Sequence, residues 1–566
     1  MTYFPTKLSF TWLKGAYLRG EVTPEQVMQE ITNRAEQYQE YNIWITAPDM
    51  AGMRSYIDKL PKTPSDDYPL WGIPFAIKDN IDLAGVSTTA GCPDYGYIPK
   101  ENAAVVEKLI AAGAIPVGKT NLDQFATGLV GTRSPYGECC NSFQPELISG
   151  GSSSGSAVSV ALGMAAFSLG TDTAGSGRVP AALNALFGYK PPLGAWSTKG
   201  VVPACASLDC ITVFANHLED IKQINTVARG FDESFCWSRE YAKPVGILPK
   251  RIILPKEELK FFGDYSDIFR TKWEKAVERI KSMGITVEYL DCTMFGKAAA
   301  LLYDGPLVAE RWKDLGDFIE SHSGKIFPVT EEILRSGNKP EYTAASLYDA
   351  MHQLAEFKCA ASRILKDSVL VMPTCGGTFT REQVRMDPIA ANSMMGLYTN
   401  HCNLLDLCGA AVPTETSCKK MPFGITIFGL SHMEGMVLET ADAFLNQETM
   451  RIAVCGLHKK GYPLESQLME LGASYTGPSR TADCYQLYRL DTNPVKPGMV
   501  RDESGACINV DIYEIPVKQF GKFMRQVPEP LTIGTITLHD GRKVKGFLCE
   551  SYAAEAGVDI TSRKSF

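Results

Sequence analysis

Residues 149–157 read SGGSSSGSA, and residues 170–178 read GTDTAGSGR. A flexible linker of this composition would continue without periodicity. Here an apolar helical pattern covers 154–163 and a strand-like pattern covers 165–171. We therefore interpret the two stretches as tight loops between packed elements. Glycine lets a backbone approach a ligand closely, and the successive amides of residues 173–176 can form a nest for an oxyanion. The loops are candidates for a catalytic site.

The sequence on either side of these loops alternates helix with strand. A helix is expected over 102–112 and a buried strand over 114–117, and the same order recurs at 271–283 and 285–290. Such alternation predicts an α/β fold with helices packed on a sheet. Short alternating strands follow a composition change near 447. We therefore expect a large domain over 1–447 and a smaller α+β domain over 448–566.

Composition narrows the class of protein. The chain has 566 residues, of which 45% are hydrophobic and 21% charged, and its net charge is −8. It holds no apolar run of about 18 residues, no signal-peptide pattern and no basic cluster, so we expect a cytoplasmic protein that binds neither membrane nor nucleic acid. The 16 cysteines show no zinc spacing and are expected to be reduced thiols. The first of only seven histidines is His217.

A serine nucleophile in this region therefore needs a base other than histidine. Ser176 has no histidine within 40 residues on either side. Lys78 ends an apolar strand in WGIPFAIKDN (residues 71–80), and a buried lysine kept neutral can serve as a base. Taken alone, this lysine is better explained as a surface residue at the end of a strand. Asp172 and Arg178 are expected to brace the loop as an ion pair.

Taken together, IPFAIKDN, GGSSSGSA and GTDTAGSGRVPAA resemble the motifs of the amidase signature family, over about residues 10–445. The resemblance implies a mixed central sheet covered by helices, and no cofactor or metal. It implies Ser176 as nucleophile, Ser152 with a cis peptide bond as proton relay, and Lys78 as general base. The oxyanion hole would be built from the amides of Thr173, Ala174, Gly175 and Ser176.

Further segments look like the allophanate hydrolase branch of this family, including a C-terminal domain that resembles the gamma-glutamyl cyclotransferase fold. The branch implies that Tyr303 and Arg311 bind the substrate carboxylate, with Gly128 in the loop beside the substrate. A bidentate arginine suits a carboxylate, although Arg311 could otherwise be a surface residue near a helix start.

The branch further implies a small-molecule substrate, allophanate, whose urea-type C–N bond is hydrolysed to ammonia and N-carboxycarbamate in urea or s-triazine catabolism. We also expect a homodimer and a functional link to a separate urea carboxylase. The C-terminal domain would either assist decarboxylation or organise the dimer.

Three alternatives remain open from the sequence. Residues 113–120, GAIPVGKT, match the phosphate-loop pattern G-x-x-x-x-G-K-[ST], although a helix and not a strand is expected before them. The chain could also be a non-catalytic protein that keeps the fold. Finally, it could be a general amidase or the amidase subunit of a glutamine amidotransferase.

Overall fold

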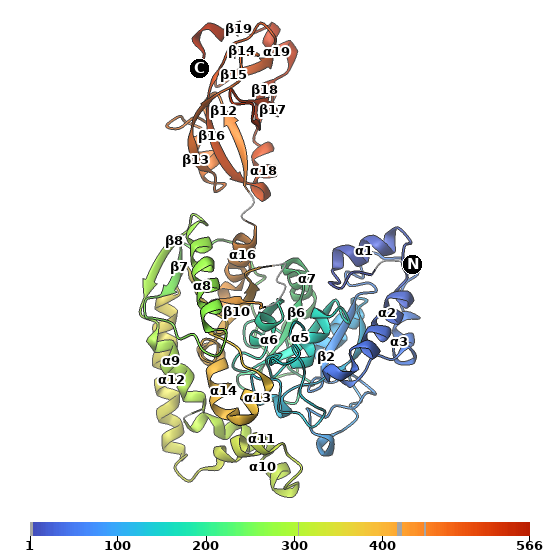
Figure 1. The fold of residues 1–566 in the computed structure, drawn as a ribbon. Helices are drawn as coiled ribbons and strands as arrows, with labels where there is room; N and C mark the ends of the chain where they lie inside the picture. Colours follow the sequence, from blue (N-terminus) through green and yellow to red (C-terminus); the bar gives the residue numbers. More distant parts are fainter. Residues whose placement is uncertain (1–3, 304, 416–420, 447–448) are drawn as a thin grey trace. The chain divides into compact units, whose positions relative to one another are not determined.

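The computed structural model describes residues 4–303, 305–415, 421–446 and 449–566. The chain divides into two compact units, Met1–Asp442 and Ala443–Phe566, and each is described by itself. Figure 1 shows the ribbon of both.

In the described residues of the larger unit, eleven strands form one sheet in the order β1-β3-β2-β4-β6-β5-β10-β11-β9-β7-β8. The sheet is mixed. Strand β2 runs parallel to β3 and β4, whereas β6 pairs antiparallel with both β4 and β5. The strands are β1 (Trp44–Thr46), β2 (Pro74–Lys78), β3 (Ile115–Thr120), β4 (Phe167–Asp172), β5 (Phe187–Lys190), β6 (Cys210–Ala215), β7 (Arg251–Pro255), β8 (Thr286–Leu290), β9 (Ser368–Pro373), β10 (Leu407–Pro413) and β11 (Gly424–Leu430).

Helices cover this sheet. They are α1 (Phe10–Leu18), α2 (Pro24–Gln37), α3 (Met50–Ile57), α4 (Ala104–Ala111), α5 (Ser154–Ala161), α6 (Val179–Leu183), α7 (Leu218–Ala228), α8 (Ser266–Lys281), α9 (Thr293–Tyr303), α10 (Ala309–Ser321), α11 (Pro328–Arg335), α12 (Ala344–Ile364), α13 (Arg381–Met386), α14 (Pro388–Met395), α15 (His401–Leu404) and α16 (Glu434–Leu445). The small-residue helix α5 packs on β2, β3, β4 and β6, and α9 lies beside α12 (Figure 1).

Two neighbouring strands of the sheet bring Lys78 and the second glycine-rich loop to the same place. Strands β2 and β4 are parallel neighbours, with Ile77 opposite Leu169. Lys78 is the last residue of β2, and Asp172 is the last residue of β4. Because parallel strands present their carboxyl ends at one edge of a sheet, this edge is where functional groups gather.

The smaller unit is an α+β structure. In its described residues a five-stranded sheet has the order β13-β16-β12-β18-β17, and a second sheet has the order β15-β14-β19. Its elements are β12 (Thr449–Val454), α17 (Glu465–Met469), β13 (Ser474–Arg480), β14 (Tyr485–Leu490), β15 (Lys496–Arg501), β16 (Asn509–Pro516), α18 (Val517–Met524), β17 (Leu531–Thr537), β18 (Lys543–Cys549), α19 (Ser551–Glu555) and β19 (Val558–Asp559).

The predicted fold class is confirmed: a mixed α/β sheet covered by helices, with a smaller sheet-containing unit after it. The phosphate-loop alternative fails, because residues 115–120 form strand β3 and helix α4 precedes them. Lys119 lies buried in that strand, with Nζ 3.5 Å from Asp79 Oδ1. The cysteines in the described residues are free thiols. No helix in the described part of the chain is long and apolar enough to cross a membrane.

Candidate active site

The Lys78 side chain lies fully buried at the end of β2. Its Nζ donates to Ser152 Oγ at 2.8 Å and to Thr171 Oγ1 at 2.7 Å. Burial lowers the pKa of Lys78 to about 7, against the opposing charges of Asp209 and other carboxylates nearby. The lysine can therefore lose its proton near neutral pH, which is the property that a general base requires.

Ser152 lies in the loop that leads into α5, and the Gly151–Ser152 peptide bond is cis, as expected. The loop is packed so closely that a Cβ on Gly151 would lie 2.0 Å from Asp123 Oδ2. The same carboxylate accepts a hydrogen bond from Gly131 N at 3.0 Å. Only glycine fits at position 151, because the carboxylate that ties residues 123–131 together occupies the space of a side chain.

Ser176 lies in the nucleophile loop, which we define as residues 172–178, between β4 and α6. Its side chain is almost fully buried, and its Oγ donates to the carbonyl of Gly128 at 3.4 Å. Within the described part of the chain, the Ser176 hydroxyl makes no hydrogen bond to Ser152. Lys78 and Ser152 are in direct contact at this end of β2, and Ser176 follows the carboxyl end of the neighbouring strand β4.

The nucleophile loop is braced by an ion pair, as predicted. Asp172 and Arg178 are both fully buried, and Arg178 Nε lies 2.9 Å from Asp172 Oδ2. Burial would raise the pKa of Asp172, but the Arg178 guanidinium, together with Lys190 and the Gly177 amide, holds it below its ordinary value. The carboxylate also accepts from Gly175 N at 2.8 Å and Gly177 N at 2.9 Å. The Gly175 amide, one of the expected oxyanion donors, is therefore engaged by Asp172.

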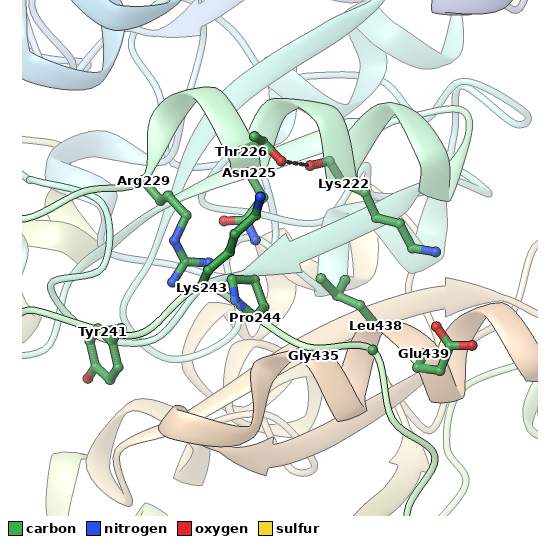
Figure 2. A pocket seen from close by; sticks show the side chains of 11 residues that line it. Lys222, Asn225, Thr226, Arg229, Tyr241, Lys243, Pro244, Gly435, Leu438 and Glu439 are labelled. Atoms are coloured by element: carbon green, nitrogen blue, oxygen red, sulfur yellow. Dashed lines mark hydrogen bonds between the residues drawn. The ribbon is translucent and has the colours of Figure 1, made fainter.

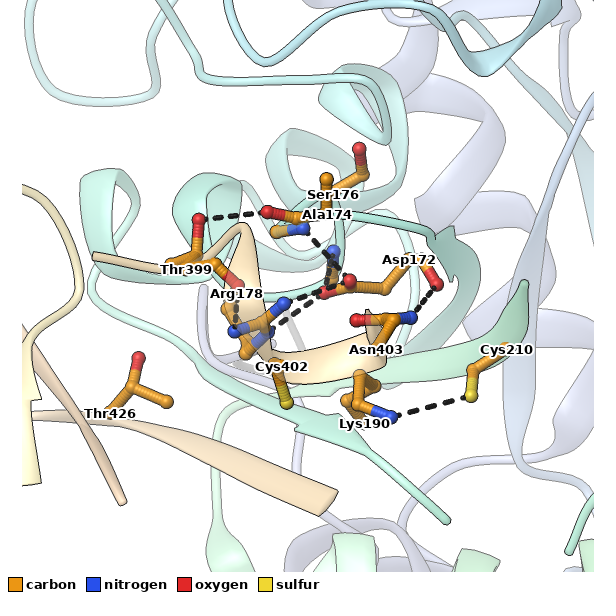
Figure 3. A network of polar contacts seen from close by, with 12 residues as sticks. Asp172, Ala174, Ser176, Arg178, Lys190, Cys210, Thr399, Cys402, Asn403 and Thr426 are labelled. Carbon is orange, nitrogen blue, oxygen red and sulfur yellow. Dashed lines mark hydrogen bonds and ion pairs between the residues drawn. The ribbon is translucent and has the colours of Figure 1, made fainter. Parts of the chain in front are cut away.

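Residues 399–403, which we name the clamp, hold the nucleophile loop through hydrogen bonds (Figure 3). Thr399 Oγ1 donates to the carbonyl of Ala174 at 2.9 Å, and Asn403 Nδ2 donates to that of Asp172 at 2.7 Å. Arg178 Nη1 donates to the Thr399 carbonyl at 3.1 Å. Sequence reasoning missed Thr399 and Asn403, and no motif around them could have revealed their contacts.

Arg311 is buried in the first turn of α10, with 2% of its surface exposed. Its Nη1 donates to Thr127 Oγ1 at 3.5 Å. Thr127 precedes Gly128, so the guanidinium contacts the residue next to the one whose carbonyl accepts from Ser176. The side chain of Tyr303, the other residue predicted to bind carboxylate, lies outside the described residues, although its backbone ends α9.

A carboxylate that the sequence did not single out completes the site. Asp209 accepts a hydrogen bond from the Thr173 hydroxyl and backbone bonds from Ala204 N at 2.7 Å and Cys205 N at 3.2 Å. Burial raises the pKa of Asp209 to about 6. Its spacing of 36 residues from Thr173 carries no local pattern, and the contact is set by β4 and β6 being neighbours.

A cavity of about 550 Å³ lies elsewhere, between α7, α16 and the segment 241–246 (Figure 2). Its described lining contains none of the candidate catalytic residues. Two of its cations are already paired, Lys222 with Asp442 at 3.2 Å and Arg229 with Glu434. The candidate active site therefore lies at the carboxyl ends of β2 and β4, and not in this cavity.

Comparisons with known proteins identify the family of this chain. The family model described as Amidase matches residues 26–438. The chain belongs to the amidase family. A second model, described as Allophanate hydrolase C-terminal domain, matches residues 450–566 of this amidase.

Individual relatives of this amidase fall into two groups. It is 38% identical over 546 residues to urea amidolyase from Saccharomyces cerevisiae, a match that covers 88% of this chain and 29% of that protein. It is 29% identical over 461 residues to a glutamyl-tRNA(Gln) amidotransferase subunit from Acidobacterium capsulatum, covering 75% of this chain and 96% of that one. The solved allophanate hydrolase of Kluyveromyces lactis is 36% identical, with a TM-score of 0.73 over 99% of this chain and 98% of that one. The chain spans about a third or less of the length of the urea amidolyases that it matches.

Proposed function

We propose that this chain is an amidohydrolase that releases ammonia from allophanate. The observation that carries the proposal is the buried contact between Lys78 Nζ and Ser152 Oγ. Ser176 follows the neighbouring strand β4 and contacts Gly128, the residue after the Thr127 that the buried Arg311 contacts. The relatives named urea amidolyase and allophanate hydrolase support the choice of substrate.

In the proposed reaction, neutral Lys78 accepts a proton from Ser152, which accepts one from Ser176 as Ser176 Oγ attacks the terminal urea carbonyl. A hydroxyl can donate and accept at once, so Ser152 can connect the two groups. For this step the Ser176 hydroxyl hydrogen must turn from Gly128 to Ser152. The developing oxyanion would be held by the amides of Thr173, Ala174 and Ser176, because the Gly175 amide is engaged by Asp172.

The tetrahedral intermediate then breaks its C–N bond. Ammonia leaves with the proton returned through Ser152, and the acyl group stays on Ser176. Water, deprotonated through the same relay, attacks the acyl-enzyme and releases N-carboxycarbamate. This product can lose carbon dioxide, so the nitrogen ends as ammonia.

Substrate choice in this proposal rests on the carboxylate of allophanate. Arg311 offers a planar, permanently charged group that can bind a carboxylate with two parallel hydrogen bonds. Tyr303 is proposed as its partner. An amidotransferase-type amidase, supported by the match to the Acidobacterium capsulatum protein, is the second candidate, but the family model over residues 450–566 favours allophanate.

One assay separates these substrates. Ammonia release is measured with allophanate, malonamic acid, biuret and glutamine side by side, using the purified chain. The proposal expects the highest kcat/KM for allophanate and a clear preference for malonamic acid over biuret, because only the first two carry a carboxylate beside the amide. Preference for glutamine would support the amidotransferase alternative.

We propose a chemical role for the smaller unit as well. A pocket of about 230 Å³ in it is lined by His458, Gln467 and Lys496, among others. His458 Nε2 lies 3.0 Å from Gln467 Oε1, and its ring stacks on Phe547. Burial lowers the pKa of His458 and so favours the neutral ring. A neutral imidazole near a lysine supports assisted decarboxylation over a purely structural role.

Further parts of the proposal concern organisation. We propose separate domains over 1–447 and 448–566, a homodimer in the cytoplasm, and a functional link to a urea carboxylase. The urea amidolyase relatives support that link, because the matched region is part of a much longer chain there.

A further inference from the structure

Residues 204–209, which we name the connector loop, contact the start of α10. Ser207 N donates to Glu310 Oε1 at 2.8 Å, and Ser207 Oγ donates to Glu310 Oε2 at 2.6 Å. Both oxygens of one carboxylate are thus bound by one residue that lies 103 positions away in the sequence. Hydrogen bonds to a charged acceptor are the stronger kind, so this pair fixes the first turn of α10 against the loop.

The first turn of α10 also carries Arg311. The connector loop reaches this residue directly, because the Cys205 thiol interacts with the Arg311 side chain. Burial raises the pKa of Cys205 to about 12, against the lowering effect of the Arg311 charge. The thiol is therefore neutral beside the guanidinium, and the group of this loop that acts on the Arg311 charge is the Asp209 carboxylate. An arginine has several rotatable bonds, and ordering it before substrate arrives reduces the entropy cost of binding.

The other end of the connector loop holds the nucleophile loop. Asp209 accepts from the Thr173 hydroxyl on one oxygen, and from the Ala204 and Cys205 amides on the other. Six consecutive residues thus join two parts of the site. One part is the arginine proposed to bind the carboxylate, and the other is a residue proposed for the oxyanion hole.

We propose that Ser207 and Glu310 form a positioning pair that holds Arg311 in register with the nucleophile loop and so determines selectivity for amides that carry a carboxylate. This inference rests on the proposed function of Arg311. Neither residue of the pair takes part in bond making. Loss of the pair is therefore expected to weaken the binding of the carboxylate and to leave the chemistry of an uncharged amide in place.

The test compares malonamate with malonamide, which differ in one carboxylate, on Ser207→Ala, Glu310→Gln and the double variant. Glu320→Gln is the matched control, since this glutamate lies exposed on the same helix. For either single variant, kcat/KM for malonamate should fall about 10- to 100-fold through KM, the cost of one charged hydrogen bond. The value for malonamide should stay within about twofold, and the double variant should lose little more than either single one.

A second measurement removes turnover from the readout. In a Ser176→Ala background, the dissociation constant of malonate is measured by calorimetry with and without Glu310→Gln, and it should rise by a similar factor. Equal losses on malonamate and malonamide, or no loss on either, would overturn the positioning pair.

Arg311→Ala separates this inference from the proposed function. If Arg311→Ala abolishes the preference for malonamate while Ser207→Ala and Glu310→Gln keep it, the positioning pair is wrong and the role of Arg311 stands. If Arg311→Ala keeps the preference, the proposed function of Arg311 is wrong.

Discussion

Lys78 and Ser152 stand 74 positions apart in the sequence and meet in a 2.8 Å hydrogen bond that is closed off from solvent. The contact exists because β2 ends beside the loop that precedes α5. It joins an amine with a lowered pKa to a hydroxyl, an arrangement that can move a proton without histidine.

Lys78→Ala should lower kcat for malonamide about 10²- to 10⁴-fold, the usual contribution of a positioned base. Ammonia release measures the rate, and far-ultraviolet circular dichroism checks that the fold persists. Turnover within tenfold of the wild type would show that another group serves as the base.

The activity should depend on pH through the same lysine. Since the pKa of Lys78 is lowered to about 7, kcat/KM for malonamide should rise about tenfold per unit below pH 7 and level off above it. Malonamide is chosen because it has no carboxylate to titrate. A flat profile between pH 5.5 and 8 would contradict a lysine base with this pKa.

The lowered pKa of Lys78 should also make the free energy of unfolding depend on pH. An unfolded chain keeps Lys78 near its ordinary pKa of 10.5, whereas the folded chain holds it near 7. Between these values the unfolded state binds more protons, so this residue makes the free energy of unfolding rise with pH. Lys78→Met lacks that dependence. We expect the free energy of unfolding of Lys78→Met to exceed that of the wild type by an amount that falls as pH rises. Urea unfolding at pH 7, 8 and 9 measures the difference, and a difference that grows with pH would contradict the lowered pKa.

Arg178→Met should destabilise the larger unit by about 3–5 kcal/mol, because it leaves the Asp172 carboxylate buried without its cation. Thermal unfolding measures the loss. The double variant Asp172→Asn with Arg178→Met removes the uncompensated charge and should recover part of the stability. If the double variant is less stable than Arg178→Met, the ion pair does not govern the loop.

Gly151→Ala should prevent the Ser152 loop from forming, since a Cβ would lie 2.0 Å from Asp123 Oδ2. We expect a lower melting temperature and loss of ammonia release. Gly296→Ala in α9 is the matched control, because a Cβ there meets nothing within 4 Å. In a helix that change should be neutral or stabilise by up to about 1 kcal/mol. Equal behaviour of the two variants would contradict the close packing of Gly151.

Elements with local causes are the ones that a sequence pattern can predict. Thr23 caps α2 with a reciprocal bond to Gln26, so the start of that helix is encoded within four residues. The strand expected over 114–117 instead runs over Ile115–Thr120. It extends because β3 keeps pairing with β2 up to Lys78 opposite Thr120, and a pairing partner is not visible in the strand itself.

The residues of the candidate site also divide into those with a local sequence signal and those without one. Lys78, Ser152 and Ser176 stand out in the sequence because each lies in a dense motif. Asp209 and Asn403 do not stand out, because they contact the nucleophile loop only once the sheet has folded. Long-range hydrogen bonds leave no periodic pattern in the sequence. Residues that support the site through such bonds therefore cannot be predicted in the way that the motif residues can.

The clamp by Asn403 has a consequence for how the protein is made. Asn403 reaches Asp172 across 231 positions of sequence. At about 5–20 residues per second, a ribosome needs roughly 10–50 s to synthesise that stretch. A nascent chain therefore carries Ser176 long before the residue that holds its loop. This part of the site can form only after most of the larger unit has left the ribosome.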